Sequence, residues 1–405
     1  MNILFMEMQH QNLPLMKKLV EDGNTVYTTQ HLDNPDYLRY FGIKPVDKFP
    51  FLNWEGGEVG RYSELVGLPL VHELIDELNL DLIVCSAPSL GHLLDGIDFP
   101  VINTSEQSRM LETNKLFARK FAEGCGIKLP KIIASGDNHL ELDASQLETP
   151  FVLKPKEVWH SSCIVHDSGM WEHGKQQWLR PPVEFYCEEM IKGLETNISY
   201  IMSDGKWAFT FSESCDESLA KRIEYNNPLA WFRNTTIDEL IPEVDRMVRD
   251  NVVGYLNEAA KLGGTYEGSI TQMLGEDGEL YFLENNVRPY THNSFPIPLG
   301  GNEYLDAFQN DPQKIGDCFT GRKFPKLVFQ SESLTAPNQE NVIKYPMHLH
   351  EKYNVHVPTG LHYVEKEKEF YCVTGAVVIV FEDFINMDFV EEMKKESNLL
   401  PYWGE

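Results

Sequence analysis

The sequence lacks the features that mark membrane-spanning and secreted proteins. No apolar run approaches the roughly 20 residues that a membrane helix needs, and the mean hydropathy is −0.34. The 7 cysteines are an odd number and form no CxxC pair, so neither a disulfide framework nor a zinc knuckle is indicated. The first residues show no basic segment followed by the apolar core of a signal peptide. We therefore expect reduced thiols and a cytoplasmic protein that makes no membrane contact.

Basic residues are also scarce. The chain has 35 Lys and Arg against 62 Asp and Glu, which gives a formal net charge of −27. Proteins that bind nucleic acid over a broad surface draw their affinity from clustered Lys and Arg. We therefore expect no extended nucleic-acid surface, small-molecule substrates as partners, and a monomer or dimer. A local basic pocket for a nucleotide remains compatible with this charge.

Several catalytic signatures are absent as well. The sequence contains no GxGxxG after a strand, no GxxxxGK[ST], no HExxH, no GxSxG and no kinase catalytic loop. A conventional dinucleotide-binding dehydrogenase, a P-loop NTPase and a kinase are therefore not indicated. The length of 405 residues and the 42% of hydrophobic residues fit two or three globular domains.

Strands and helices alternate over the first hundred residues. Strand-like runs at 3–6 and 82–85 are separated by helical patterns at about 13–21 and 62–78. Such alternation is typical of βαβ units with a parallel sheet. We predict an amino-terminal α/β domain over residues 1–103.

The pattern changes after residue 103. Thr104 and Gln107 have the spacing of a capping box, which predicts one helix running to about residue 123, and a second long helix is predicted over about 237–262. Strands of a hairpin are predicted at 265–274 and 279–285, joined by a four-residue turn. The other predicted strands cover 151–154, 185–191, 198–202, 362–365, 369–373 and 376–381. We place a central module at 104–310 and a small β-rich domain at 311–405.

The exit of the hairpin carries the most informative polar residues. Alternation along a strand projects Glu284, Asn286 and Arg288 to one face. Two oxygen donors and a guanidinium make a poor core but a good site for a hard cation that bridges phosphates. A solvated strand face is the alternative interpretation.

Two lysines and an acidic segment add to this pattern. Lys115 lies in the helix after Thr104, and Lys154 ends the apolar strand that begins at Phe151. A lysine at the end of a buried strand is costly unless an anion pairs with it. The segment from Glu188 through Ile191 to Glu195 can offer backbone groups to a base and a carboxylate to a ribose; an edge strand leading into a turn is the alternative.

Taken in order, these segments resemble the ATP-grasp superfamily and, within it, phosphoribosylamine–glycine ligase. The resemblance runs from about Asp81 to Arg288. It implies a mixed α/β and α+β fold, in which 1–103 form the βαβ pre-ATP-grasp domain. The ATP-grasp module of two subdomains then covers 104–310, and 311–405 form the small carboxy-terminal β-rich domain.

The resemblance also implies roles for single residues, with ATP and Mg²⁺ or Mn²⁺ as cofactors. Arg288, together with Arg222, would hold the reacting carboxylate or the transferring phosphoryl group. Gln272 takes the place where related enzymes often carry an acidic metal ligand. The phosphates would lie on Lys115 and Lys154, the adenine at Glu188, Glu189 and Ile191, the ribose on Glu195, the metal on Glu284 and Asn286, and Lys221 would also contact the nucleotide.

The implied activity is that of an ATP-dependent carboxylate–amine ligase, which forms an amide through an acyl phosphate. The family uses glycine and phosphoribosylamine. The loop from Met6 to Asn12 has no glycine, and without glycine a backbone cannot approach a phosphate closely. We therefore favour glycine or another small amino acid joined to a different amine, for example one on a modified nucleotide or base. A genuine phosphoribosylamine–glycine ligase and a non-catalytic nucleotide-binding relative are the alternatives.

Overall fold

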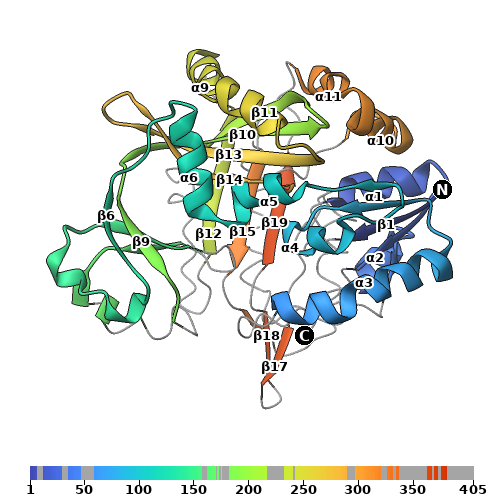
Figure 1. Ribbon diagram of the computed structural model, residues 1–405, viewed down its shortest axis with the longest axis horizontal. Helices are drawn as coiled ribbons and strands as arrows, with labels where there is room; N and C mark the ends of the chain where they lie inside the picture. The colour runs from blue at the N-terminus through green and yellow to red at the C-terminus, as the bar shows by residue number, and fades with distance from the viewer. Residues whose placement is uncertain are drawn as a thin grey trace.

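The structure is a computed structural model of the chain, and it describes the following residues: 1–6, 12–29, 35–46, 59–156, 162–169, 171–172, 175, 182–216, 232–239, 242–289, 297–320, 326–331, 334–336, 363–366, 369–372 and 375–380. Only the backbone is described for 35–37, 59–68, 89, 215–216, 232–239 and the strands after 325. Three main sheets follow one another in the molecule, and Figure 1 shows the amino-terminal sheet on the right and the four-stranded sheet on the left.

The amino-terminal sheet is parallel and has the strand order β3-β2-β1-β4-β5. Alternate residues of β1 enter two different cores: Ile3 and Phe5 pack toward α1, whereas Leu4 and Met6 pack toward the other layer. Both faces of the sheet are therefore covered, as parallel sheets require. The elements are β1 (Asn2–Met6), α1 (Leu13–Glu21), β2 (Thr25–Thr28), α2 (Pro35–Tyr40), β3 (Lys44–Pro45), α3 (Val59–Leu78), β4 (Leu82–Cys85), α4 (Pro88–Gly91) and β5 (Val101–Ile102).

Two helices, α5 (Glu106–Thr113) and α6 (Lys115–Gly124), replace the single helix predicted from the capping box. The Ser105 hydroxyl, rather than Thr104, accepts from the backbone N–H of Ser108 at 3.0 Å. Asn114 ends α5 in an extended conformation, and its side chain caps α6 by accepting from the Phe117 N–H at 2.9 Å. The predicted N-cap was therefore wrong by one residue, and the second helix start was missed. Ser and Asn are both good N-cap residues, which is why Ser105 begins α5 and Asn114 begins α6.

An antiparallel four-stranded sheet with the order β6-β9-β7-β8 follows these helices. Its inner face packs Phe151, Leu153 and Cys187 into one small core. This sheet carries Lys154 near the end of β7. The strands are β6 (Ile132–Gly136), β7 (Phe151–Pro155), β8 (Cys163–Val165) and β9 (Phe185–Glu189).

The central sheet has seven strands in the order β14-β13-β10-β11-β12-β15-β19. The helix predicted over 237–262 was partly wrong, because β12 (Phe232–Glu239) precedes α9 (Pro242–Ala260). The last two strands come from the carboxy-terminal part of the sequence, so that part adds directly to the central sheet. The other strands are β10 (Gly193–Ser203), β11 (Lys206–Asp216), β13 (Thr265–Gly275), β14 (Leu280–Asn286), β15 (Lys326–Ser331) and β19 (Gly375–Val380).

The two faces of the central sheet have different neighbours. One face packs on α9, while α10 (Gly301–Asn310) and α11 (Pro312–Phe319) join the other face to α1 and the amino-terminal sheet (Figure 1). A separate three-stranded sheet is formed by β16 (Leu334–Ala336), β17 (Tyr363–Lys366) and β18 (Glu369–Cys372). Within the described parts of the chain, no helix combines the length and apolar character that a bilayer crossing requires.

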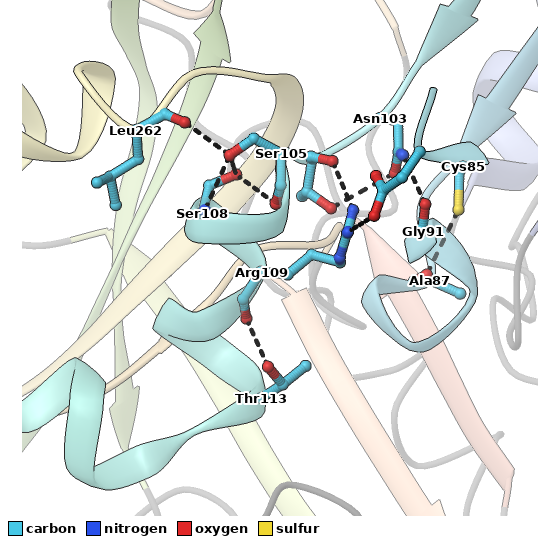
Figure 2. A network of polar contacts seen from close by, with 11 residues as sticks. Cys85, Ala87, Gly91, Asn103, Ser105, Ser108, Arg109, Thr113 and Leu262 are labelled. Atoms are coloured by element: carbon cyan, nitrogen blue, oxygen red, sulfur yellow. Dashed lines mark hydrogen bonds and ion pairs between the residues drawn. The ribbon is translucent and has the colours of Figure 1, made fainter. Parts of the chain in front are cut away.

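A polar network ties α5 to both neighbouring regions (Figure 2). Arg109 forms an ion pair with Asp95 and donates to the Thr104 carbonyl at 2.8 Å. On the opposite side, the Ser105 hydroxyl donates to the Leu262 carbonyl after α9 at 2.6 Å. These contacts hold the start of α5 between the amino-terminal and central sheets. They therefore also hold the side chains of its last turn, among them Glu112, in place.

Candidate active site

A β-bulge directs the polar residues of β14 to the face of the central sheet that lies opposite α9, which we call the open face. Thr271 pairs with Glu284, but Gln272 pairs with Phe282, so Leu283 is the extra residue. Phe282 consequently packs in the core under α9, while Glu284 lies on the opposite face despite the even spacing. Bulges of this kind re-aim side chains and are common beside active sites.

Glu284 lies beside the two predicted phosphate lysines. Burial acts to raise its pKa, but Lys115, Lys154 and the Asn286 amide outweigh burial and hold the pKa of Glu284 below its usual value. Burial in turn lowers the pKa of Lys115, against the attraction of Glu284. Glu284 thus lies close to Lys115 and Lys154, both of which precede it by more than a hundred residues in the sequence.

Lys154 is held in place by two protein groups. Its Nζ lies 2.8 Å from Glu188 Oε2 and donates to the Leu283 carbonyl at 3.0 Å. Glu188 is only 3% exposed and also pairs with Arg119. Both carboxylate oxygens of Glu188 are thus engaged by cations of the protein, and the adenine contact of Glu188 stays a prediction.

Arg288 is positioned by Glu112, which sequence reasoning missed. Arg288 Nε donates to Glu112 Oε1 at 2.6 Å, and the Val287 N–H donates to Glu112 Oε2 at 2.8 Å. Arg288 Nη2 also lies 3.5 Å from Asn286 Oδ1. Glu112 lies in the last turn of α5, 176 residues before its partner in the sequence. The only sequence signal was a carboxylate on a buried helix, which does not reveal a partner so distant along the chain.

Gln272 does not belong to the site. Its side chain lies on the α9 face, where it accepts from Asn251 Nδ2 at 2.5 Å and donates to the Val248 carbonyl at 3.2 Å. The residue opposite Glu284 is Thr271, whose hydroxyl donates to Asn197 Oδ1 at 2.9 Å. The expectation for Gln272 was wrong because the bulge moves the pairing by one residue.

The predicted ribose residue Glu195 lies at the far end of β10, and the predicted adenine residues Glu189 and Ile191 lie at the end of β9 and between β9 and β10. Gly193 pairs with Gly275, and a Cβ on Gly193 would lie 1.9 Å from the Leu274 carbonyl oxygen, so no larger residue fits there. Ile191 packs beside Gly275. The Glu189 carboxylate accepts from the Lys131 N–H at 2.8 Å. Glu195 pairs with Met273, two positions before Asn197, and therefore faces the same side of the sheet.

The donors around Glu284 fit a magnesium ion. Mg²⁺ in nucleotide sites is held by one or two protein oxygens, with phosphates and water completing the octahedron. Glu284 supplies a carboxylate whose pKa is lowered, and the Asn286 side chain lies 3.2 Å from it. Within the described residues there is no cluster of three or more His, Cys, Asp or Glu that would bind a metal without such a ligand. The predicted Lys221 and Arg222 lie outside the described residues.

Comparisons with known proteins identify the fold. No protein-family profile and no curated protein sequence matches the chain. Solved structures match over nearly its whole length. An L-amino acid ligase from Bacillus licheniformis has a TM-score of 0.62 at 14% identity and covers 98% of this chain and 97% of its own. A phosphoribosylamine–glycine ligase from Thermotoga maritima has a TM-score of 0.59 at 12% identity, with coverages of 99% and 97%.

A third match is an N5-carboxyaminoimidazole synthase from Aspergillus clavatus, solved with ADP and 5-aminoimidazole ribonucleotide. Its TM-score is 0.60 at 11% identity, and it covers 99% of this chain and 98% of its own. The chain therefore has the ATP-grasp fold, which confirms the predicted fold class.

Proposed function

We propose that the protein is an ATP-dependent carboxylate–amine ligase that forms an amide through an acyl phosphate. The observation that carries this proposal is the convergence of Lys115, Lys154 and Glu284 between two sheets, with Arg288 beside them. Neighbours of the same fold include an amino acid ligase and a phosphoribosylamine–glycine ligase. Two lysines, one ionised acid and an arginine suit the transfer of a highly charged phosphoryl group.

In this proposal the substrate carboxylate attacks the γ-phosphorus of ATP, and ADP leaves. Lys115 and Lys154 hold the phosphates, and Arg288 orients the carboxylate or the transferring group. Glu284 and Asn286 would hold Mg²⁺, which supplies neutralisation of phosphate charge when it is bound. An amine then attacks the acyl carbon, loses a proton, and displaces inorganic phosphate to form the amide. Positioning and charge neutralisation carry such a transfer, so no covalent enzyme nucleophile is required.

For the carboxylate substrate we propose glycine or another small amino acid. We propose an amine other than phosphoribosylamine as the acceptor. The sequence of the loop after Met6, which contains no glycine, supports this choice, because a sugar phosphate needs converging backbone N–H groups or basic side chains. Of that loop, the structure describes Asn12, whose side chain donates to the Ser86 hydroxyl at 2.7 Å.

The test is an ADP-release screen of amino acids crossed with amines, including freshly generated phosphoribosylamine. We expect ADP release that depends on both substrates in the wild type, loss of it in Glu284→Gln, and wild-type rates in Glu243→Gln. Glu243 is an exposed acid on α9 and provides a charge-matched control. Nucleotide binding without turnover in any combination would favour the non-catalytic relative. Turnover with phosphoribosylamine and glycine in the usual range of about 1–10³ per second would restore the purine-synthesis alternative.

A further inference from the structure

A second polar feature lies farther along the same sheet face. A cavity with about 450 Å³ of empty space, its mouth included, opens between the amino-terminal region and the central sheet. Its walls include Leu15, Ile201, Phe211 and Phe319. One carboxylate, that of Glu267 on β13, belongs to the lining, together with the polar side chains of Asn12, Thr210 and Tyr304.

Glu267 has an unusual set of neighbours. Its carboxylate accepts from the Tyr304 hydroxyl at 2.6 Å, and no cation of the described residues pairs with it. Burial raises the pKa of Glu267, and the Tyr304 hydrogen bond only partly opposes this. Glu267 is half-buried, and a carboxylate that loses much of its water without a cation beside it is costly. The position therefore suits a ligand that brings the missing positive charge.

The position of this cavity follows from strand register. On the open face, Thr271 pairs with Asn197 and Glu284, Ser269 pairs with Ser199 and Asn286, and Glu267 pairs with Ile201. At about 3.4 Å per residue, Glu267 lies roughly 7 Å beyond the row that contains Asn286. Glu195, predicted for the ribose, and Gly193 lie at the opposite end of this face, next to the segment of the predicted adenine residue Ile191, which we call the hinge.

This order is that of an extended nucleotide followed by its reaction partner. If the base lies at the hinge and the γ-phosphate at Glu284 and Asn286, the next position along the sheet is the Glu267 cavity. Between them, the buried Ser269 hydroxyl makes no hydrogen bond with any of the described residues. A ligand that spans from the phosphate row into the cavity would pass this hydroxyl and could satisfy it.

We propose that the cavity binds the primary ammonium group of an amino substrate, with Glu267 as its counterion and the apolar walls around its carbon body. The inference rests on the proposed ligase function and specifies the substrate class of that site. The residues lining the cavity, all within the described part of the chain, include no Lys, Arg or His. Among these described residues, the phosphate of a phosphorylated amine would find no basic side chain, so we favour an amine with a small apolar body.

Direct binding tests this proposal without turnover. Propylamine and propanol, its uncharged counterpart, are titrated by ligand-observed NMR. We expect the wild type and Glu243→Gln to bind propylamine about tenfold or more tightly than propanol, and Glu267→Gln to lose this preference. Tyr304→Phe, which keeps the Glu267 carboxylate, should retain most of the preference for propylamine. Equal binding of both probes to the wild type, or equal losses in Tyr304→Phe and Glu267→Gln, would overturn the proposal.

Kinetics then identify which substrate carries the ammonium. In Glu267→Gln we expect the KM of either the amino acid or the amine acceptor to rise about tenfold or more, while the KM for ATP stays within about twofold. Unchanged KM values for both substrates would overturn the inference and leave the ligase function standing. Propylamine selectivity in a protein that releases no ADP would support the cavity and contradict the ligase function, so the two failures are distinguishable.

Discussion

The two faces of β13 are equally buried but chemically opposite. Tyr266 and Ile270 pack against α9 in an apolar core, whereas Ser269 and Thr271 face the candidate site. Ser269 and Ile270 are both 0% exposed. On the packed face, Asn285 accepts from Tyr200 and donates to Tyr255, each at 3.0 Å, whereas the Tyr266 hydroxyl has no hydrogen-bond partner among the described residues.

The open face leaves polar atoms without hydrogen bonds, among them Ser269 Oγ and Asn197 Nδ2. Neighbouring residues of one strand therefore follow two different rules. One face packs mainly apolar side chains against α9, whereas the other carries mainly hydroxyl and amide groups, of which Ser269 and Asn197 keep hydrogen-bonding capacity for a ligand at a cost in stability. Substitutions on the two faces should consequently separate activity from stability.

The largest effect is expected from the residues proposed to hold the metal. Glu284→Gln and Asn286→Ala should each lower kcat by about 10³-fold or more, because they remove oxygen donors next to the transferring phosphoryl group. The melting temperature should change little, since Glu284 is not part of an apolar core. Steady-state ADP release and thermal melts measure the two quantities. Wild-type rates in either variant would remove these residues from the site.

The next largest effect distinguishes the two faces directly. Ile270→Ala should lower the free energy of unfolding by about 2–5 kcal/mol, because it leaves a cavity under α9. Ser269→Ala, one residue away, should leave stability unchanged or slightly raised, because it removes a buried hydroxyl that has no partner. Denaturant titrations of both variants give the comparison. A large loss in Ser269→Ala would show that the two faces do not differ as described.

A smaller effect is expected at Glu112. Glu112→Gln should lower kcat about 10- to 100-fold with a smaller change in the KM for ATP, because Arg288 loses its charged support and its alignment. A double-mutant cycle tests this indirect role. In an Arg288→Lys background, Glu112→Gln should cost much less than it does alone. Fully additive losses would indicate that Glu112 acts independently of Arg288.

The smallest effect concerns stability and pH. Because the pKa of Lys115 is lowered in the folded state, its charged form opposes folding at neutral pH, and this cost disappears as pH rises toward the unfolded-state pKa. Lys115→Met should therefore raise the melting temperature by about 1–2 °C at pH 7. The gain over wild type should shrink by pH 10, while nucleotide affinity falls at both pH values. A gain that grows with pH would contradict this account.

The polar residues at the end of the hairpin could be predicted from the sequence because strand alternation and turn signals are local patterns. Alternation placed Glu284, Asn286 and Arg288 on one face, and the turn at 275–278 defined the hairpin. Alternation did not reveal that a bulge separates Phe282 from Glu284, because a bulge depends on pairing across strands. The same missing information led to the wrong expectation for Gln272.

Contacts between residues far apart in the sequence could not be predicted from such local patterns either. Glu112 meets Arg288 across 176 residues, and nothing in a helical pattern specifies such a contact. The pairing of Lys154 with Glu188 likewise became visible only when β7 and β9 were placed side by side. Glu267 was not singled out from the sequence, because its importance comes from the cavity that other segments build around it.

The central claim is that Lys115 and Lys154 hold nucleotide phosphates beside a metal held by Glu284 and Asn286. Calorimetric titration with a non-hydrolysable ATP analogue, with and without Mg²⁺, tests it most directly. The account predicts that the wild type binds the analogue and that Mg²⁺ tightens binding about tenfold or more. It also predicts that Glu284→Gln loses the Mg²⁺ effect, whereas the control variant Glu243→Gln keeps it. No binding by the wild type, or an equal Mg²⁺ effect in Glu284→Gln, would contradict the claim.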